Sequence, residues 1–481
     1  MKQPILCLLF LFTGVVACGQ EKWDLKECVE YARANNISIR QADLQTRFAE
    51  LDLDQSRGAQ LPSVNFGSNA GLSFGRRENP TTGVLEDQNF FSTNLNLQSG
   101  VTLFNWFALR HSREASRLSV EASRAQVQKA QDDVSLNVAV GYLQALLARE
   151  QANLSRVQIR QTTAQLEATR RQVAVGNLPE LNAAELEAQL ARDSSTLITA
   201  EASAQQFILQ LKALLNIDAA APFEIETPPV ELIPVENIAD LQPEAVYNSA
   251  VQNLPQQKVN NLRIESATRS AAAARANLYP NISAFANLGT NYIYFRQPVY
   301  SQVVSGFSPT GLRVDAGGGN FYNVEAPVVT QGSRTGFFTP AGLGNQLSAN
   351  FGQGVGIGVQ VPILNGRTAR INLERAKLNI RQFELQGELD KQTLKQDIYR
   401  NYTDAVAALQ KFNANKKGVE TATRAFDFAQ RRYTLGLVST YDLMTSQNNL
   451  QRARIELLYA QFDYVFKMKL LEFYKGQGLK L

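Results

Sequence analysis

One long stretch of the chain, almost free of helix breakers, limits the possible folds more than any other feature. Residues 105–174 contain no proline and a single glycine, Gly141. As an α-helix at ~1.5 Å per residue, this stretch would be on the order of 100 Å long, far longer than a compact domain is wide. Residues 180–216 predict another long helix, and residues 25–57 predict one of roughly half that length. We therefore expect an elongated helical protein.

The sequence is also internally duplicated. The turn-like segment around Gly176 aligns with the segment around Gly436. Nearer the N-terminus, Pro62 aligns with Pro280 at a smaller offset, so the second copy carries an insertion between these two points. The order within each copy is helix, strand, strand, helix, helix, which predicts that one structural unit occurs twice.

These repeats define the expected organisation of the chain. We expect the first repeat at residues 20–217, a linker at 218–241 and the second repeat at 242–481. The insertion falls within residues 296–348, which contain Gly317–Gly319 and four prolines. Glycine and proline in this density are typical of loops, so we expect one long loop there.

Four short segments alternate between apolar and polar residues, which is the pattern of β-strands with two different faces. Each is close to the ~9 to 11 residues that a tilted strand needs to cross a bilayer. The apolar positions are Val64, Phe66, Ala70, Leu72 and Phe74; Leu95, Leu97, Val101 and Leu103; Ile282, Ala284, Ala286, Leu288 and Tyr292; and Val355, Ile357, Val359 and Val361. Taken alone, the strands also fit a soluble sandwich with one wet face.

The N-terminal residues 1–19 predict an export signal, because Lys2 precedes a short apolar run and small residues follow it. The mature protein is then expected outside the cytoplasm. The residues are compatible with two ways of processing the signal. Cleavage could follow Gly19, or Cys18 could be the lipidated first residue of a bacterial lipoprotein.

The composition gives no support for nucleic-acid binding or catalysis. The 48 Lys and Arg residues are balanced by 44 Asp and Glu residues, with no basic cluster for a phosphate backbone. His111 is the only histidine, and Gly317–Gly319 lacks the strand-to-helix context of a phosphate-binding loop. We expect neither an enzyme nor a cofactor or metal site.

Four strands per chain are too few to close a barrel, and open strand edges are not tolerated in lipid. The chain should therefore assemble with copies of itself. Two copies would supply 8 strands and three would supply 12, and the larger number readily leaves a water-filled lumen.

The sequence resembles the TolC-like outer-membrane efflux proteins. The resemblance rests on the duplicated order, on the strand exit Val361–Gly366, and on a turn with Tyr433, Gly436 and Asp442 at family-like spacing. It implies a mixed α/β membrane protein, in which a homotrimer forms a 12-stranded outer-membrane β-barrel continued by a long α-helical barrel. The protein would lie in the outer membrane of a Gram-negative bacterium, in contact with its lipid, and extend into the periplasm.

In such proteins the helical hairpin tips receive a periplasmic adaptor, which connects the channel to an inner-membrane transporter. The resemblance therefore implies that the adaptor contacts are Val175, Gly176, Leu435, Gly436 and Leu437. The alternative for each glycine is an ordinary helix C-terminus that contacts no partner.

The resemblance also implies a periplasmic gate. Asp442 lies where family members place an acidic ring, although an exposed acid at a helix N-terminus is the alternative. Tyr433 and Asn182 correspond to a pair that locks neighbouring hairpins, with Asn182 replacing an expected aspartate. A second acid of the ring is replaced by Thr445.

These features together predict the exit duct of a tripartite efflux or type I secretion system. The alternative is a periplasmic coiled-coil adaptor or scaffold, which would explain the helices but give the four strands no role. The exported substrate and the identity of the pump cannot be inferred from the residues of a passive outlet.

Overall fold

The computed structural model describes residues 22–78, 85–87, 89–226 and 236–476. The predicted export segment, with the alternative lipidation site Cys18, lies outside the described residues. No helix within the described ranges is both long and apolar enough to cross a membrane.

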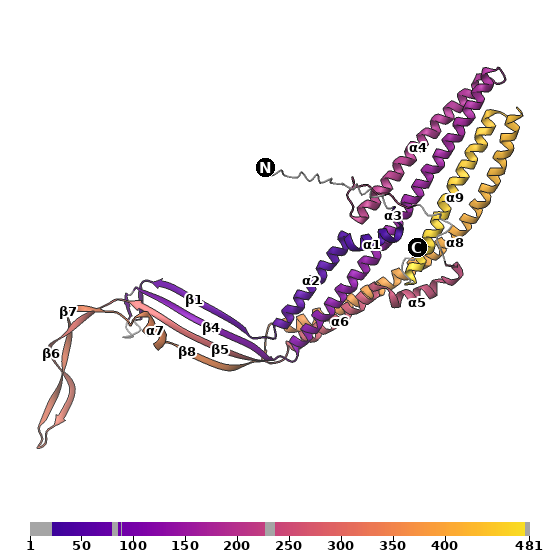
Figure 1. Cartoon of the computed structure of the whole chain (residues 1–481). Coiled ribbons are helices and arrows are strands. Elements are labelled where there is room, and N and C mark those ends of the chain that lie inside the picture. Colours follow the sequence, from indigo (N-terminus) through magenta and orange to yellow (C-terminus); the bar gives the residue numbers. More distant parts are fainter. Residues whose placement is uncertain (1–21, 79–84, 88, 227–235, 477–481) are drawn as a thin grey trace, which may run out of the picture. The chain divides into compact units, whose positions relative to one another are not determined.

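The contacts of the chain divide it into two units (Figure 1). The helical unit comprises the residues up to Asp54, Glu114–Ser270 and the residues from Arg375 onward, and the strand unit comprises Gln55–Arg113 and Ala271–Glu374. Each unit takes segments from both sequence repeats.

The elements of the two repeats follow the same order. In the first repeat they are α1 (Leu25–Asn35), α2 (Ile37–Gly58), β1 (Ser63–Ser73), β4 (Phe90–Phe104), α3 (Ala108–Ala174) and α4 (Glu180–Leu215). In the second repeat they are α5 (Pro243–Asn253), α6 (Pro255–Ala276), β5 (Asn281–Phe295), β8 (Gly352–Gln360), α8 (Thr368–Thr434) and α9 (Thr440–Tyr474). The duplicated helix-strand-strand-helix-helix order expected from the sequence is therefore present.

The expected half-length helix at 25–57 is in fact two helices. Asn36 separates α1 from α2, with its backbone in an extended conformation. Its side chain accepts a hydrogen bond from the Ser38 backbone N–H (2.8 Å) and donates one to the Leu214 carbonyl (2.8 Å). An Asn side chain that satisfies backbone groups in this way competes with helix continuation.

The insertion at 296–348 is not the irregular loop that we expected. It contains β6 (Gln297–Asp315) and β7 (Phe321–Phe338), which pair as an antiparallel hairpin, followed by α7 (Leu343–Ala349). The Gly317–Gly319 run lies in the hairpin turn. Three of the four prolines, Pro298, Pro309 and Pro327, lie in strands whose pairing register shifts at four places, and such irregularities tolerate proline and hide the alternation of a strand.

The four predicted strands form one antiparallel sheet in the order β1-β4-β5-β8. Two further short strands, β2 (Arg76–Glu78) and β3 (Leu85–Asp87), pair with each other. In the four-stranded sheet, Phe66 pairs with Leu97 and Leu97 pairs with Leu288, so apolar side chains of neighbouring strands share one face. The opposite face carries mostly Asn, Gly, Ser and Gln residues, with apolar exceptions such as Phe285 and Ile293. The alternation seen in the sequence thus gives a sheet with one apolar and one polar face.

The helical unit contains two main hydrophobic clusters that occupy equivalent positions in the two repeats. One includes Val138, Tyr142 and Leu211, all almost fully buried. The other includes Ile398 and Leu471, which are the equivalents of Val138 and Leu211 in the second repeat. The duplication therefore extends from the order of the elements to their packing.

Candidate functional site

The hairpin α3–α4 ends in a tight turn that contains Gly176. The N–H of Gly176 donates to the Val173 carbonyl (2.9 Å), and the N–H of Asn177 donates to the Gln172 carbonyl (2.9 Å). These two bonds define a Schellman motif, which satisfies the last carbonyls of a helix. Gly176 has φ +78°, a left-handed conformation that residues with a Cβ atom adopt only with strain.

The hairpin α8–α9 ends in the same motif. Gly436 has φ +72°, its N–H donates to the Tyr433 carbonyl (2.9 Å), and the Leu437 N–H donates to the Arg432 carbonyl (2.9 Å). A Cβ atom at Gly176 or at Gly436 would meet no heavy atom within 4 Å. Glycine is therefore required by the backbone conformation of each tip and not by crowding.

The tips expose apolar side chains. Val175, Leu435 and Leu437, which we predicted as adaptor contacts, are between 62% and 72% exposed. Leu181 and Tyr441, in the first turns of α4 and α9, are exposed to a similar degree and were not predicted. Large apolar side chains gathered at one exposed end indicate a binding surface.

Tyr433 joins the two hairpins to each other. Its hydroxyl lies 3.2 Å from the Thr169 hydroxyl on α3 and 3.3 Å from the Thr440 hydroxyl on α9. Asn182, the partner that the resemblance suggested, is half-buried, and its backbone N–H donates to the Pro179 carbonyl. Within one chain, the Tyr433 hydroxyl therefore forms hydrogen bonds with two threonines. A contact between Tyr433 and Asn182 of a neighbouring copy remains a prediction.

Asp442 is exposed and caps its own helix. Its carboxylate accepts hydrogen bonds from the backbone N–H (3.2 Å) and the hydroxyl (2.7 Å) of Ser439, while its own N–H donates to the Ser439 hydroxyl (3.1 Å). This reciprocal arrangement is a capping box. Within one chain, Asp442 is therefore an exposed acid at a helix N-terminus. The acidic ring needs three copies of the chain and remains a prediction.

A buried polar layer, absent from our predictions, lies on the same helices. Asp193 on α4 is only 8% exposed and accepts hydrogen bonds from Thr162 on α3 (2.7 Å) and from Gln189 (2.8 Å). Gln447 on α9 donates to the Thr162 hydroxyl (3.3 Å). Because three helices contribute to this layer, no local sequence pattern identifies it. The layer ties α3, α4 and α9 together.

The described residues show no arrangement for metal binding: within these ranges, no group of three or more His, Cys, Asp or Glu side chains could hold a metal ion. The features that stand out are instead the two hairpin tips and the sheet that is apolar on one face. A sheet with one apolar and one polar face is the arrangement that strands between lipid and water require.

Comparison with known proteins gives the family. The chain matches the family model for outer membrane efflux proteins over residues 28–216 and 246–467. These two segments cover most of the chain, so the protein belongs to the outer membrane efflux protein family.

Individual relatives are distant but cover nearly the whole chain. The chain is 23% identical to outer membrane protein TolC of Escherichia coli strain K12 over 465 residues, which span 96% of this chain and 83% of TolC. The solved structure of CusC matches with a TM-score of 0.73 at 17% identity, over 95% of this chain and 93% of CusC. VceC from Vibrio cholerae matches with a TM-score of 0.71 at 17% identity, over 95% of this chain and 97% of VceC. The fold is therefore shared over 95% of the chain.

Proposed function

We propose that the protein is the exit duct of a tripartite efflux or type I secretion system, assembled as a homotrimer. The observation that carries this proposal is the four-stranded sheet with exposed apolar side chains on one face and with β1 and β8 at its two ends. Strand edges must be paired in lipid, and three copies supply the 12 strands of a barrel with a water-filled lumen. In this trimer the apolar face contacts the outer-membrane lipid.

A second observation supports self-assembly. On α8, Ile371, Leu378 and Leu385 are exposed and follow one another at intervals of seven residues, and Leu389 continues the row. This apolar row, which we call the seam of α8, lies along one face of the helix and can pack against a neighbouring helix. We propose that a neighbouring copy of the chain packs against this row, because the same oligomer also closes the sheet. The helices of three copies would then enclose a periplasmic tunnel.

The hairpin tips are the proposed docking site for a periplasmic adaptor, which in turn contacts an inner-membrane transporter. The exposed Val175, Leu435 and Leu437 and the two Schellman turns at Gly176 and Gly436 support this role. An adaptor hairpin that packs closely against a glycine turn needs both the apolar side chains and the absence of a large side chain at the glycine.

The proposed gate lies beside the tips. The Tyr433 hydroxyl links the two hairpins of one chain through Thr169 and stabilises its own hairpin through Thr440, and release of the Thr169 contact would let the hairpins separate. In a trimer, three copies of the exposed Asp442 would face one axis and favour cations over anions. Asn182 is the candidate partner of Tyr433 from a neighbouring copy.

Planar bilayers test the proposal. Purified protein should insert and give stable single channels that favour cations, because the lumen is water-filled and closed by three copies. A protein that remains soluble without detergent and gives no channels would instead support the periplasmic adaptor or scaffold. Export of a transported compound by cells that carry Gly436→Trp should fall while channels persist, since the bulky side chain obstructs docking, whereas Gly436→Ala, which has the same left-handed strain without the bulk, should export normally.

A further inference from the structure

The four junctions between strands and helices lie at one end of the main sheet. Phe104, at the end of β4, is opposite Ile282 near the start of β5. Gln360, at the end of β8, is opposite Asn281, and the first residue of β1 is opposite Gly100 near the end of β4. All four junctions belong to the strand unit. We call their parts of this unit the junction segments: residues 55–62, 105–113, 271–280 and 361–374.

The junction segments are strongly basic. They contain one acidic residue, Glu374, and no lysine. At the other end of β1, by contrast, the β2–β3 register places Arg76 opposite Asp87, so charges of both signs lie together. The junction segments therefore concentrate positive charge at one end of the sheet. Their arginines, all of them exposed, are Arg57, Arg110, Arg113, Arg275, Arg367 and Arg370.

Two of these arginines lie at helix N-termini, where a positive charge is unfavourable because the helix dipole is positive at that end. Arg110 is the third residue of α3, and Arg370 is the third residue of α8, which is the equivalent position in the second repeat. Neither helix has an acid in its first turn, whereas α1, α4, α5 and α9 each have one. An anion from outside the chain would compensate both the arginines and the helix N-termini.

Aromatic side chains accompany the arginines at the two inner strands of the sheet. Trp106 and Phe107, between β4 and α3, are 44% and 55% exposed. The Trp106 ring lies 4.9 Å from the Tyr279 ring, just before β5, and Phe104 contacts both Trp106 and Phe107. We call these four residues the aromatic cluster. Because β4 and β5 are inner strands, the cluster is separated from the edge strands β1 and β8, with which neighbouring copies would pair.

The backbone of the aromatic cluster is strained. Trp106 and Phe107 have φ values of +53° and +63°, in the left-handed region that bulky residues rarely adopt. Their equivalents in the second repeat, Gly366 and Arg367, have φ values of +61° and +65°, so both repeats make the same turn. The first position of this turn accepts glycine without strain, yet the first repeat has a tryptophan there. A strained aromatic residue that stays exposed indicates a role other than packing within the chain.

We propose that the junction segments bind the surface of a phospholipid bilayer, with the aromatic cluster at the level of the headgroups and the arginines on anionic phosphate groups. Trp and Tyr are favoured at this level because their rings are apolar and their polar atoms stay in contact with water. Basic residues beside them attract anionic lipids. The bound surface continues the apolar face of the sheet. The inference rests on the proposed function, in which that face contacts lipid, and adds the class of lipid that the junctions bind.

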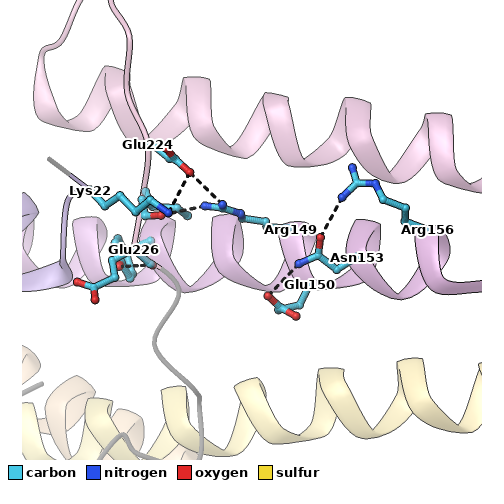
Figure 2. Close-up of polar contacts among 9 residues, drawn as sticks. Lys22, Arg149, Glu150, Asn153, Arg156, Glu224 and Glu226 are labelled. Atoms are coloured by element: carbon cyan, nitrogen blue, oxygen red, sulfur yellow. Dashed lines mark hydrogen bonds and ion pairs between the residues drawn. The ribbon is translucent and has the colours of Figure 1, made fainter. Parts of the chain in front are cut away.

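Tryptophan fluorescence can report the environment of Trp106, because the chain has only one other tryptophan, Trp23 in the helical unit. The Trp23 backbone N–H donates to the Glu224 carbonyl (2.9 Å). The Lys22 ammonium and the Arg149 guanidinium approach the Glu224 carboxylate at 3.6 Å and 3.2 Å (Figure 2). These contacts do not involve the Trp23 ring, so Trp23→Phe should leave this segment in place. The variant then has Trp106 as its single tryptophan.

Vesicles of brominated phosphatidylcholine test the level of the aromatic cluster. In the full-length Trp23→Phe protein, bromine attached near the headgroups should quench Trp106 more strongly than bromine attached near the bilayer centre. The Trp106→Phe protein gives the background signal. Absence of quenching by either lipid, or stronger quenching from the bilayer centre, would overturn the proposal. Shielding of Trp106 from iodide in the water without quenching by lipid would also overturn it, because another protein surface would then cover the cluster.

Brominated phosphatidylglycerol, added as a minor component to phosphatidylcholine vesicles, tests the role of charge. It should quench Trp106 more than the same amount of phosphatidylcholine brominated at the same positions. This preference should fall about two- to fivefold in Arg110→Gln/Arg113→Gln, because basic residues near the surface attract the anionic lipid. Arg76→Gln/Arg296→Gln is the matched control, since it removes the same charge elsewhere in the strand unit and should keep the preference. Equal quenching by the two lipids, or equal preference in both double variants, would overturn the proposal.

Single-channel recordings from the same protein separate this inference from the proposed function. A protein that forms channels while Trp106 shows no contact with lipid would overturn the inference and leave the proposed function intact. A protein that neither inserts into vesicles nor forms channels would contradict the proposed function and the inference together.

Discussion

Helices α3 and α8 occupy equivalent positions in the two repeats and have the same length of 67 residues, yet they differ sharply in burial. Leu118 on α3 is 5% exposed, whereas its equivalent on α8, Leu378, is 68% exposed. Buried residues follow α3 over most of its length, but on α8 they gather near Ile398 and Ala405. The duplicated helix in the first repeat is covered by its own chain, and the one in the second repeat has an apolar seam available to another copy.

The two hairpin tips differ in another way. Their glycine turns are the same, but the helices that follow the turns begin differently. Helix α9 begins with the capping box of Ser439 and Asp442, whereas the equivalent positions of α4 are Pro179 and Asn182, and Pro179 provides no side-chain cap. Both tips have the glycine turn, but only the α8–α9 tip has a carboxylate, Asp442, at the third residue of the helix that follows. We therefore expect the second hairpin to carry the charge effects of the gate.

The largest expected effect comes from the matched pair Leu118→Ala and Leu378→Ala. Leu118→Ala should lower the free energy of unfolding by about 2–5 kcal/mol, because it leaves a cavity in a packed site. Leu378→Ala should change the helix content and folding of a single chain little. It should instead weaken the trimer, as measured by the detergent concentration or temperature at which the trimer dissociates. If Leu378→Ala leaves dissociation unchanged, the exposed seam of α8 is not a subunit interface.

Alanine at the two glycine turns should have a smaller effect that is the same at both tips. Gly176→Ala and Gly436→Ala place a Cβ atom on a left-handed backbone in open space, which costs about 1–2 kcal/mol of local strain without a clash. Thermal melting of the helices should reveal equal shifts. A much larger shift at one glycine would mean that this tip is packed against another part of the assembly.

Removal of the Tyr433 hydroxyl tests the link between the hairpins. Tyr433→Phe should cost about 0.5–1.5 kcal/mol through lost hydrogen bonds, and single-channel conductance should rise because the hairpins separate more easily. Thr169→Val is the matched control, since it removes the same bond from the other side and should raise conductance without adding to the effect of Tyr433→Phe. A comparable rise in Asn182→Ala would instead identify Asn182 of a neighbouring copy as the partner.

The smallest expected change concerns Asp442. Asp442→Asn should reduce cation preference and block by multivalent cations while the trimer remains assembled, because the amide oxygen can still accept a hydrogen bond from Ser439. Ser439→Ala is the control that removes the cap and keeps the charge. Unchanged ion selectivity in Asp442→Asn, measured as reversal potential in planar bilayers, would limit Asp442 to its capping role.

Much of the fold could be predicted from the sequence because its signals are local and occur twice. The absence of proline located α3, the internal duplication predicted its counterpart α8, and alternation located the four strands of the main sheet. The β6–β7 hairpin was missed because bulges interrupt its alternation and its glycine turn resembles loop punctuation. The break at Asn36 was missed because its cause includes a hydrogen bond to Leu214, which is distant in the sequence.

The candidate site was predictable to a smaller extent. The glycine turns follow from sequence alone, and the cap of α9 is visible in the spacing of Ser439 and Asp442. The threonine partners of Tyr433 are not visible, because Thr169 lies in the other repeat and a threonine in a helix has many roles. The polar layer around Asp193 was missed for the same reason, since its partners on α3 and α9 meet only in the folded chain.

The mass of the detergent-solubilised protein tests the central claim most directly, because both the sheet edges and the seam of α8 require neighbouring copies. We predict a stable particle with three times the mass of the mature chain, obtained only when the protein is extracted from membranes with detergent. A stable monomer in detergent, or a protein released from the periplasm without detergent, would contradict the account.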